Sequence, residues 1–239
     1  RNQIGDDTII DWLATGAFAP VKHLNLGWNK INDKGMVALA KSPMLSGVEE
    51  LILDSNFIGN EGAIAIAQSK HMESLTVLEM HDNKYNQTGA NSLMDLRIRN
   101  LVKKHLSGTE LNLNGKQLEN QGLKALARSD LLANVATLSL RNNHFDYIGL
   151  EALSRSKYLS SLKSLNLMDN PILNKGTIIL AEAKVFSGLQ KLNLENCGIM
   201  PAGVLALAKS ASLEQLREVT LNKNNIKDKG IQHLAASRN

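Results

Sequence analysis

The sequence lacks the features that mark several protein classes. A single cysteine, Cys197, excludes an internal disulfide and is typical of a chain made for a reducing compartment. No apolar run approaches the roughly 18 residues that a membrane-spanning helix needs, and no basic-then-apolar leader is visible at the start, a leader removed from a precursor being the alternative. These absences predict a cytoplasmic protein. Aromatic residues make up only 4% of the chain, so its core cannot rely on rings.

Leucine and asparagine are what the sequence has in excess. They account for 39 and 25 of the 239 residues, so leucine must fill the core and asparagine needs a structural role. An apolar fraction of 43% and a charged fraction of 21% exclude a disordered or collagen-like chain. The formal net charge of +4 would point to nucleic acid or an anionic membrane only if the positive charge gathered on one surface.

One motif, L-x-L-x-x-N-x-I-x-x-x-G, accounts for both excesses and recurs along the chain. Its copies begin at residues 24, 51, 78, 111, 138, 165, 192 and 219, a spacing of 27 residues with one step of 33. The period-two leucines predict a short strand, and a Leu-Ala segment after the glycine predicts a helix. The glycine column is complete and comprises Gly35, Gly62, Gly89, Gly122, Gly149, Gly176, Gly203 and Gly230.

Two polar columns have predicted structural roles. Asparagine side chains carry donors and an acceptor, so stacked copies are expected to pair with turn backbone where each strand ends. This ladder column comprises Asn29, Asn56, Asn83, Lys116, Asn143, Asn170, Cys197 and Asn224. Cys197 is therefore expected to be a small buried ladder residue, and a reactive thiol is the alternative. Typical helix N-caps stand two residues before the glycine, at Asp33, Asn60, Asn120, Asn174 and Asp228.

The pattern closely resembles the leucine-rich repeat family, in its ribonuclease-inhibitor-like class, and especially the 27-residue versions common in bacterial proteins. The resemblance covers nearly the whole chain. It implies an α/β fold, a right-handed solenoid or horseshoe with parallel strands on the concave face and helices on the convex face. Each repeat cannot bury its own apolar side, so stacking supplies the core.

The repeats predict a single leucine-rich-repeat domain over residues 1–239, with a partial repeat over 1–20 and eight repeats over 21–239. Phe18 falls on a repeat position of the partial copy. Neither end carries the polar cap that is usual for solenoids, so we expect a fragment of a longer chain. The 33-residue step places a six-residue insertion within about residues 94–110, where it is expected to lengthen a convex helix.

The insertion is basic, because it contains Arg97, Arg99, Lys103 and Lys104. A solvated helix face explains these charges, and a contact with an anionic membrane or nucleic acid is the alternative. No aromatic residues interleave with them, as nucleic-acid contacts would favour. We therefore treat this helix as a secondary site and expect neither nucleic acid nor a membrane as the main partner.

Residues that flank the strand leucines are expected to point into the concave face, because strand side chains alternate. They comprise six acidic and two basic residues, a net charge of −4 that leaves +8 for the rest of the chain. Neighbouring strands lie about 4.8 Å apart, so the acids of repeats two to four predict one patch that docks a basic protein surface. Scattered solvated charge is the alternative. The predicted partner-binding residues of this patch and its rim are Trp28, Glu50, Asp54, Glu79, His81, Asp82 and Glu110.

Trp28 has two interpretations. It stands at the edge of the acidic patch and would anchor a partner, or it packs against the N-terminal flank of the chain.

Catalysis has little support in the sequence. Glu79 is expected roughly 8 Å from Glu50 and Asp54, which suits an inverting glycosidase, but an open curved sheet offers no pocket to raise a carboxyl pKa. His81 and Asp54 could share a metal ion, yet two ligands without a third do not make a site. Phosphate-binding glycine loops and nucleophile motifs are absent. We therefore expect no enzyme activity, no cofactor, no metal and no small-molecule substrate.

The predicted function is a non-catalytic protein–protein interaction module that binds a partner with a basic surface on its concave face. The bacterial type of the repeats suggests, by analogy, the recognition part of a secreted effector that acts in the cytoplasm of a host cell. The alternative is a regulator of a small GTPase or of another enzyme, because the repeat class is similar to that of the Ran GTPase-activating protein. No functional residue of that protein transfers to this sequence.

Overall fold

The computed structural model describes residues 2–16 and 21–237. Phe18, a predicted position of the partial repeat, lies outside the described residues. The chain divides into two compact units, residues 1–100 and 101–239, which we call the first unit and the second unit. Each unit is built of alternating strands and helices, as the repeat pattern predicts.

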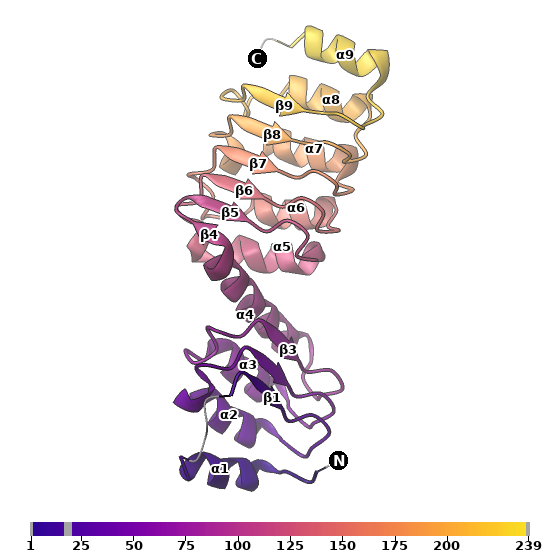
Figure 1. Cartoon of the computed structure of the whole chain (residues 1–239). Helices are drawn as coiled ribbons and strands as arrows, with labels where there is room; N and C mark the ends of the chain where they lie inside the picture. Colours follow the sequence, from indigo (N-terminus) through magenta and orange to yellow (C-terminus); the bar gives the residue numbers. More distant parts are fainter. Residues whose placement is uncertain (1, 17–20, 238–239) are drawn as a thin grey trace. The chain divides into compact units, whose positions relative to one another are not determined.

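The first unit contains a three-stranded parallel sheet (Figure 1). Leu24, Leu51 and Leu78 lie in register on adjacent strands, 27 residues apart, so sequence repeats are also spatial neighbours. Its elements are α1 (Asp6–Ala14), β1 (His23–Asn25), α2 (Asp33–Lys41), the 3₁₀ turn η1 (Pro43–Leu45), β2 (Glu50–Ile52), α3 (Asn60–Gln68), β3 (Val77–Glu79) and the first part of α4 (Gln87–His105).

The second unit stacks five parallel strands, β5 to β9, along one side and helices along the other (Figure 1). Neighbouring strands again pair leucine with leucine at a 27-residue offset, as Leu138 does with Leu165. Its elements after α4 are β4 (Leu106–Ser107), β5 (Glu110–Asn112), α5 (Glu119–Arg128), η2 (Asp130–Leu132), β6 (Thr137–Ser139), α6 (Tyr147–Ser154), β7 (Ser164–Asn166), α7 (Leu173–Glu182), η3 (Lys184–Phe186), β8 (Lys191–Asn193), α8 (Pro201–Ala208), β9 (Glu218–Thr220) and α9 (Lys227–Ala235).

The strand leucines form the core of both units. Leu51 and Leu53 in the first unit, and Leu138 and Leu140 in the second, have no exposed surface. Their flanking residues remain at least partly accessible, since strand side chains alternate between the two faces of a sheet. The predicted strand and helix of the repeat are therefore confirmed, and the arrangement is compatible with a leucine-rich repeat solenoid.

The insertion changes the strand pattern at one place. Helix α4 is 19 residues long, whereas the other described helices have 8 to 10, so the expected lengthening of a helix is confirmed. The first sheet ends at β3, and the second begins with β4, which pairs antiparallel with β5. Gly108, with φ of 58°, lies in the tight turn between β4 and β5. The sequence predicted parallel strands only, so β4 is a correction.

The asparagine ladder has the predicted hydrogen bonds. The Nδ2 group of Asn143 donates to three carbonyl oxygens at 2.8, 2.9 and 3.2 Å, and its Oδ1 accepts from the backbone N–H of Lys116 at 2.9 Å. Asn56, Asn83, Asn170 and Asn224 each donate to three carbonyl oxygens in the same way. Each of these side chains bridges two repeats and satisfies backbone that the short strands leave unpaired.

Cys197 takes an asparagine position in this ladder and is fully buried. Its Sγ lies 3.2 Å from the carbonyl oxygen of Leu167, one repeat away. Burial raises the pKa of the thiol to about 12, which leaves almost no thiolate at neutral pH. The interpretation of Cys197 as a small buried ladder residue is confirmed.

Four of the five predicted N-caps act on a different helix from the one expected. Asp33 is the first residue of α2, and its Oδ1 accepts the N–H groups of Gly59 and Gly62, at the start of α3, at 2.7 and 2.8 Å. Asn60, Asn120 and Asn174 likewise cap the helix of the following repeat. A Cβ atom at Gly62 would lie 2.8 Å from Asp33 Oδ1, so this inter-repeat cap is one reason for the glycine column.

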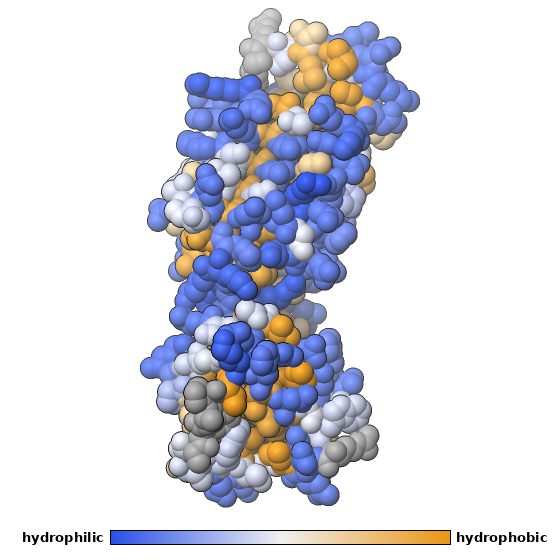
Figure 2. Space-filling view, viewed as in Figure 1, coloured by the Kyte–Doolittle hydropathy of each residue, from blue (hydrophilic) through white to orange (hydrophobic). Residues whose placement is uncertain are grey.

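The last repeat shows how much each repeat depends on its neighbour. Val219 is 37% exposed, whereas Leu192, one repeat earlier, is 2% exposed. Leu234 is 37% exposed and its equivalent Leu207 is 7% exposed. Figure 2 accordingly shows hydrophobic surface around α9. Stacking of the next repeat, and not the repeat itself, buries these positions.

Candidate functional site

The side chains that flank the buried leucines form the exposed face of each sheet. We call the face of β1–β3, with the turns that follow these strands, the first strand face; the second strand face is that of β5–β9 with its turns. The charged and apolar residues of the first strand face are His23, Trp28, Lys30, Glu50, Ile52, Asp54, Phe57, Val77, Glu79, His81, Asp82 and Lys84. It therefore brings together every predicted partner-binding residue except Glu110.

Glu50 and Glu79 lie on adjacent strands of this face. The register places Glu50 opposite Val77 and Ile52 opposite Glu79, so the two carboxylates are diagonal neighbours, as the sequence predicted. Glu50 Oε2 lies 2.8 Å from Nδ1 of His23 on β1. Val77 is 40% exposed, so an apolar side chain is accessible beside the charges.

Asp54 has a structural role as well as a charge. Its Oδ1 accepts the backbone N–H of His81 at 2.7 Å. In the second unit Asn114 makes the equivalent bond to the N–H of Arg141 at 2.8 Å, which shows that an amide serves as well. The contact between Asp54 and His81 is thus a turn-stabilising hydrogen bond to backbone.

Glu79 and Asp82 are the most available acids of this face. Both are exposed, and among the residues that the structure describes neither forms an ion pair. Asp82 Oδ2 lies 3.5 Å from the Ser55 hydroxyl, a distance beyond a strong hydrogen bond. The two carboxylates therefore present negative charge that no ion pair within the described residues neutralises.

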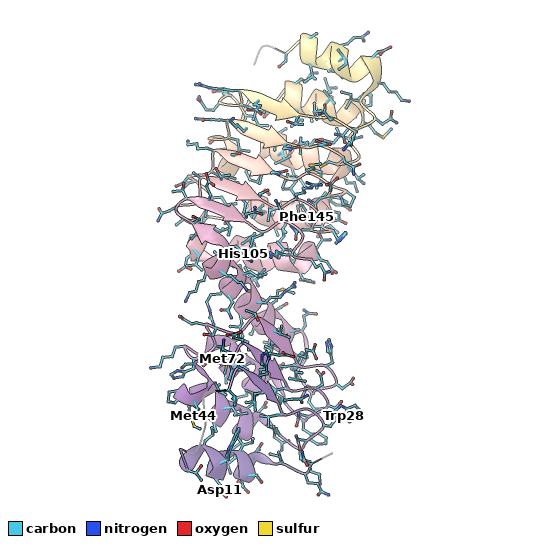
Figure 3. All side chains as sticks on the ribbon, viewed as in Figure 1. Asp11, Trp28, Met44, Met72, His105 and Phe145 are labelled. Atoms are coloured by element: carbon cyan, nitrogen blue, oxygen red, sulfur yellow. The ribbon has the colours of Figure 1, made fainter. Side chains whose placement is uncertain are left out.

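Two aromatic side chains lie at the edge of the same face. Trp28 is 55% exposed, and Figure 3 shows it at the edge of the first unit, beside the turn that follows β1. Its two interpretations, anchoring a partner and packing against the N-terminal flank, both stay predictions. Phe57, in the next repeat, is 47% exposed, with Lys84 Nζ 5.9 Å from its ring centroid. Sequence reasoning missed Phe57, although lysines at the equivalent positions 30 and 84 mark this as a solvent-facing column.

The second strand face neutralises its own charges. Arg141 Nε lies 2.8 Å from Asp169, Lys191 Nζ lies 2.9 Å from Glu218, and Lys223 Nζ lies 2.9 Å from Glu195. Each pair joins neighbouring repeats. Hydrogen bonds from Asn196 and Arg141 lower the pKa of the Asp169 carboxyl below its usual value. This face has little net charge to offer a partner.

Strand pairing does not place Glu110 beside Glu79, although the predicted patch assumed that it would. It lies on β5, whose neighbours in the sheet are β4 and β6. The first sheet ends at β3, so Glu79 and Glu110 are not on adjacent strands. The prediction assumed that consecutive repeats always pair, and the longer α4 with its hairpin breaks that rule.

The predicted basic residues all lie on α4. Arg97, Lys103 and Lys104 are exposed, whereas Arg99 is half-buried. Leu96, Ile98 and Val102 are buried, so buried apolar residues and exposed basic residues alternate along this helix. Burial and the neighbouring Lys116 and Lys104 lower the pKa of His105, at the end of this helix.

Metal sites and membrane-spanning helices are not found in residues 2–16 and 21–237. No three of the His, Cys, Asp and Glu side chains described there lie close enough to hold a metal ion. Within the described part of the chain, no helix is both long and apolar enough to cross a membrane.

Comparison with known proteins agrees with the repeat pattern. A family model described as Leucine Rich repeat matches the chain in five places, at residues 19–40, 48–67, 158–178, 189–208 and 215–235. The stretch between the second and third matches contains the lengthened α4 and the β4–β5 hairpin. No match to a curated protein was found. The five matches, the paired leucine strands and the asparagine ladder support placing this chain in the leucine-rich repeat family.

Proposed function

We propose that the protein is a non-catalytic interaction module whose first strand face binds a basic surface of a protein partner. The observation that carries this proposal is the difference in charge pairing between the two faces. Glu79 and Asp82 have no ion-pair partner in the described residues, whereas three ion pairs join neighbouring repeats on the second strand face. Leucine-rich repeats generally serve as interaction scaffolds, which agrees with this role.

We expect the charges of this face to attract the partner and the apolar side chains to supply binding energy. Uncompensated carboxylates attract a cationic partner at long range and select against an acidic one. Trp28, Phe57 and Val77 offer accessible apolar surface next to these charges. Aromatic residues at the centre of an interface commonly supply much of its binding energy.

The test compares matched charge reversals on the two faces. The first variant carries Glu79→Lys and Asp82→Lys, and the control carries Glu110→Lys and Glu218→Lys, so both change the net charge equally. Asp54 is left intact because its carboxylate supports the turn at His81. A fluorescent hexalysine peptide at low ionic strength reports binding by anisotropy, and thermal melting checks the fold of each variant.

We expect the first variant to bind the peptide at least about tenfold more weakly than the wild type, and the control within about threefold. Equal losses in both variants would show that the peptide responds only to net charge. Unchanged binding by the first variant would show that this face is not the docking surface. Either result overturns the proposal.

On the repeat pattern, we further propose that the chain forms a right-handed horseshoe of the ribonuclease-inhibitor-like class, with bacterial-type 27-residue repeats. We also propose that residues 1–239 form a single domain and that the protein is cytoplasmic. The bacterial type of the repeats supports a role as the recognition part of a bacterial secreted effector. Regulation of a small GTPase is the alternative role. We propose that the exposed basic residues of α4 do not bind an anionic partner; retention of the wild type on anionic liposomes, lost when Arg97, Lys103 and Lys104 are neutralised, would contradict this.

A further inference from the structure

The turns that lead into α7 and α8 carry exposed apolar side chains where the equivalent turns of the second unit are charged. Leu173 and Met200 are 45% and 47% exposed. Their equivalents in the other repeats of this unit are Glu119, Asp146 and Lys227. The turn therefore tolerates a charged residue at this position, and the apolar pair is confined to two neighbouring repeats.

The outer sides of the same two helices show the same change. Ile178 of α7 is 41% exposed, and Leu205 of α8 is partly exposed. The equivalent residues of α5, α6 and α9 are Lys124, Glu151 and Gln232. Two separate positions of the repeat thus become apolar in the same pair of helices, which pack against each other. We call this surface the α7–α8 patch; it comprises Leu173, Ile178, Met200 and Leu205.

Contacts between repeats bring the two turn residues of the patch together. A Cβ atom at Gly198, two residues before Met200, would lie 2.7 Å from Leu173 Cδ2, so the leucine reaches over the next turn. The Oδ1 atom of Asn174 accepts the backbone N–H of Met200 at 2.9 Å. Leu173 has left-handed backbone with φ of 59°, which is uncommon for a leucine. The chain therefore holds this side chain against the neighbouring turn and still leaves much of it accessible.

Lysines flank the α7–α8 patch. Lys175 lies in the first turn of α7, and Lys227 occupies the equivalent turn of the last repeat. Both are exposed, and neither forms an ion pair with a residue of 2–16 or 21–237. The acids of α7, α8 and α9 are Glu182, at the far end of α7, and Asp228, which stands between two lysines. Residues 101–239 contain 18 lysines and arginines and 11 acids, so the surroundings of the patch are basic.

We propose that the α7–α8 patch docks an acidic amphipathic helix of a protein partner. The apolar side chains of that helix would cover the patch, and its carboxylates would pair with Lys175 and Lys227. Packed helices lie about 8–10 Å apart, and residues i and i+7 of one helix are about 10.5 Å apart. A partner helix that crosses α7 and α8 would thus place one apolar residue on each. The patch belongs to the second unit, so this inference is independent of the proposed function.

Charge distinguishes this partner from two other occupants. A second copy of the patch would bring the lysines of both copies together, and like charges weaken an interface. An anionic membrane would attract the lysines but repel Glu182 and Asp228, whereas a protein partner can place cations opposite these acids. An acidic helix therefore fits the patch best.

The experiment measures, by anisotropy, the binding of a fluorescent helical peptide with leucines on one face and glutamates on the other. The test variant carries Leu173→Gln and Met200→Gln, which leave the net charge unchanged. Glu119 has the same left-handed backbone as Leu173, so a polar residue suits this position, and thermal melting checks the fold. The control carries Ile231→Gln and Leu234→Gln, an exposed apolar pair of α9 outside the patch.

We expect the test variant to bind the peptide at least about tenfold more weakly than the wild type, and the control within about twofold. Lys175→Gln with Lys227→Gln should weaken binding about fivefold at low salt, as should glutamine in place of glutamate in the peptide. Undiminished binding by the test variant, or equal binding of the two peptides, would overturn the proposal. Retention of the wild type on phosphatidylserine vesicles without peptide binding would assign the patch to a membrane and also overturn it.

Discussion

The two units share one scaffold but use their strand faces differently. In both, paired leucines fill the core and ladder asparagines bridge the repeats. On the second strand face, charged residues pair with partners one repeat away. On the first, Glu79 and Asp82 lie beside exposed rings without such ion pairs among the described residues. The scaffold positions are constrained by packing, so the face positions are where the two units can differ in function.

If the scaffold is common to both units, replacing a ladder asparagine should lower the free energy of unfolding by the same amount in each unit. Asn56 and Asn143 are 3% and 0% exposed, and each donates to three carbonyl oxygens. We expect Asn56→Ala and Asn143→Ala each to lower the free energy of unfolding by about 3 kcal/mol, because buried carbonyls lose their donors. Urea unfolding measures both. A loss in one unit and not in the other would break the equivalence.

The inter-repeat caps provide a second comparison of the scaffolds. A Cβ atom would lie 2.8 Å from Asp33 Oδ1 at Gly62, and 2.6 Å from Asn174 Oδ1 at Gly203. We expect Gly62→Ala and Gly203→Ala each to cost about 2 kcal/mol in urea unfolding, since the cap must shift. A methyl group at Gly47 would have nothing within 4 Å, so Gly47→Ala serves as the control with no loss. Equal stability of all three variants would contradict the capping role.

The thiol in the ladder of the second unit sharpens the comparison, since the first unit has asparagine at each ladder position. Cys197 offers one weak donor, whereas a ladder asparagine makes three hydrogen bonds. We expect Cys197→Asn to raise the free energy of unfolding by about 1 kcal/mol. The same urea titration measures it, with Cys197→Ala as the size control. A destabilised Cys197→Asn would show that the site is shaped for sulfur.

The smallest expected effect concerns the paired charges of the second strand face. The pKa of Asp169 is lowered in the folded state, so its contribution to stability is present above the unfolded carboxyl pKa and is lost as the pH falls through the folded value. We expect Asp169→Asn to cost less than about 1 kcal/mol at pH 7 and nothing near pH 2. Thermal melting at both pH values measures this. Glu79→Gln, on the first face, should change stability at neither pH.

The sequence predicts those parts of the fold that depend on local pattern. The spacing of leucine, asparagine and glycine places strands, ladder and helices correctly, because each needs a particular residue type. The spacing does not predict that Asp33 caps the helix of the next repeat, because its two hydrogen bonds join residues that are 26 and 29 positions apart. The β4–β5 hairpin was also missed, because an insertion interrupts the very repetition on which the prediction depends.

The sequence predicts which acidic residues lie on the first strand face, but not which acidic residues form ion pairs. Glu50, Asp54 and Glu79 fall on the first strand face as the alternation of strand residues predicts. The sequence could not distinguish them from Glu195 and Glu218, because pairing with lysines depends on side-chain contacts between repeats. Phe57 was missed because it lies in the turn, beyond the residues that flank the strand leucines, from which the acidic patch was predicted.

Cross-linking tests the central claim most directly, because it reports which carboxylates a bound partner touches. An arginine-rich peptide that contains a single lysine is bound to the wild-type protein and coupled with a carbodiimide, and mass spectrometry identifies the linked carboxylates. The account predicts links to Glu79 and Asp82, and none to Glu195 or Glu218, which pair with lysines of their own unit. Links distributed evenly over both strand faces would contradict it.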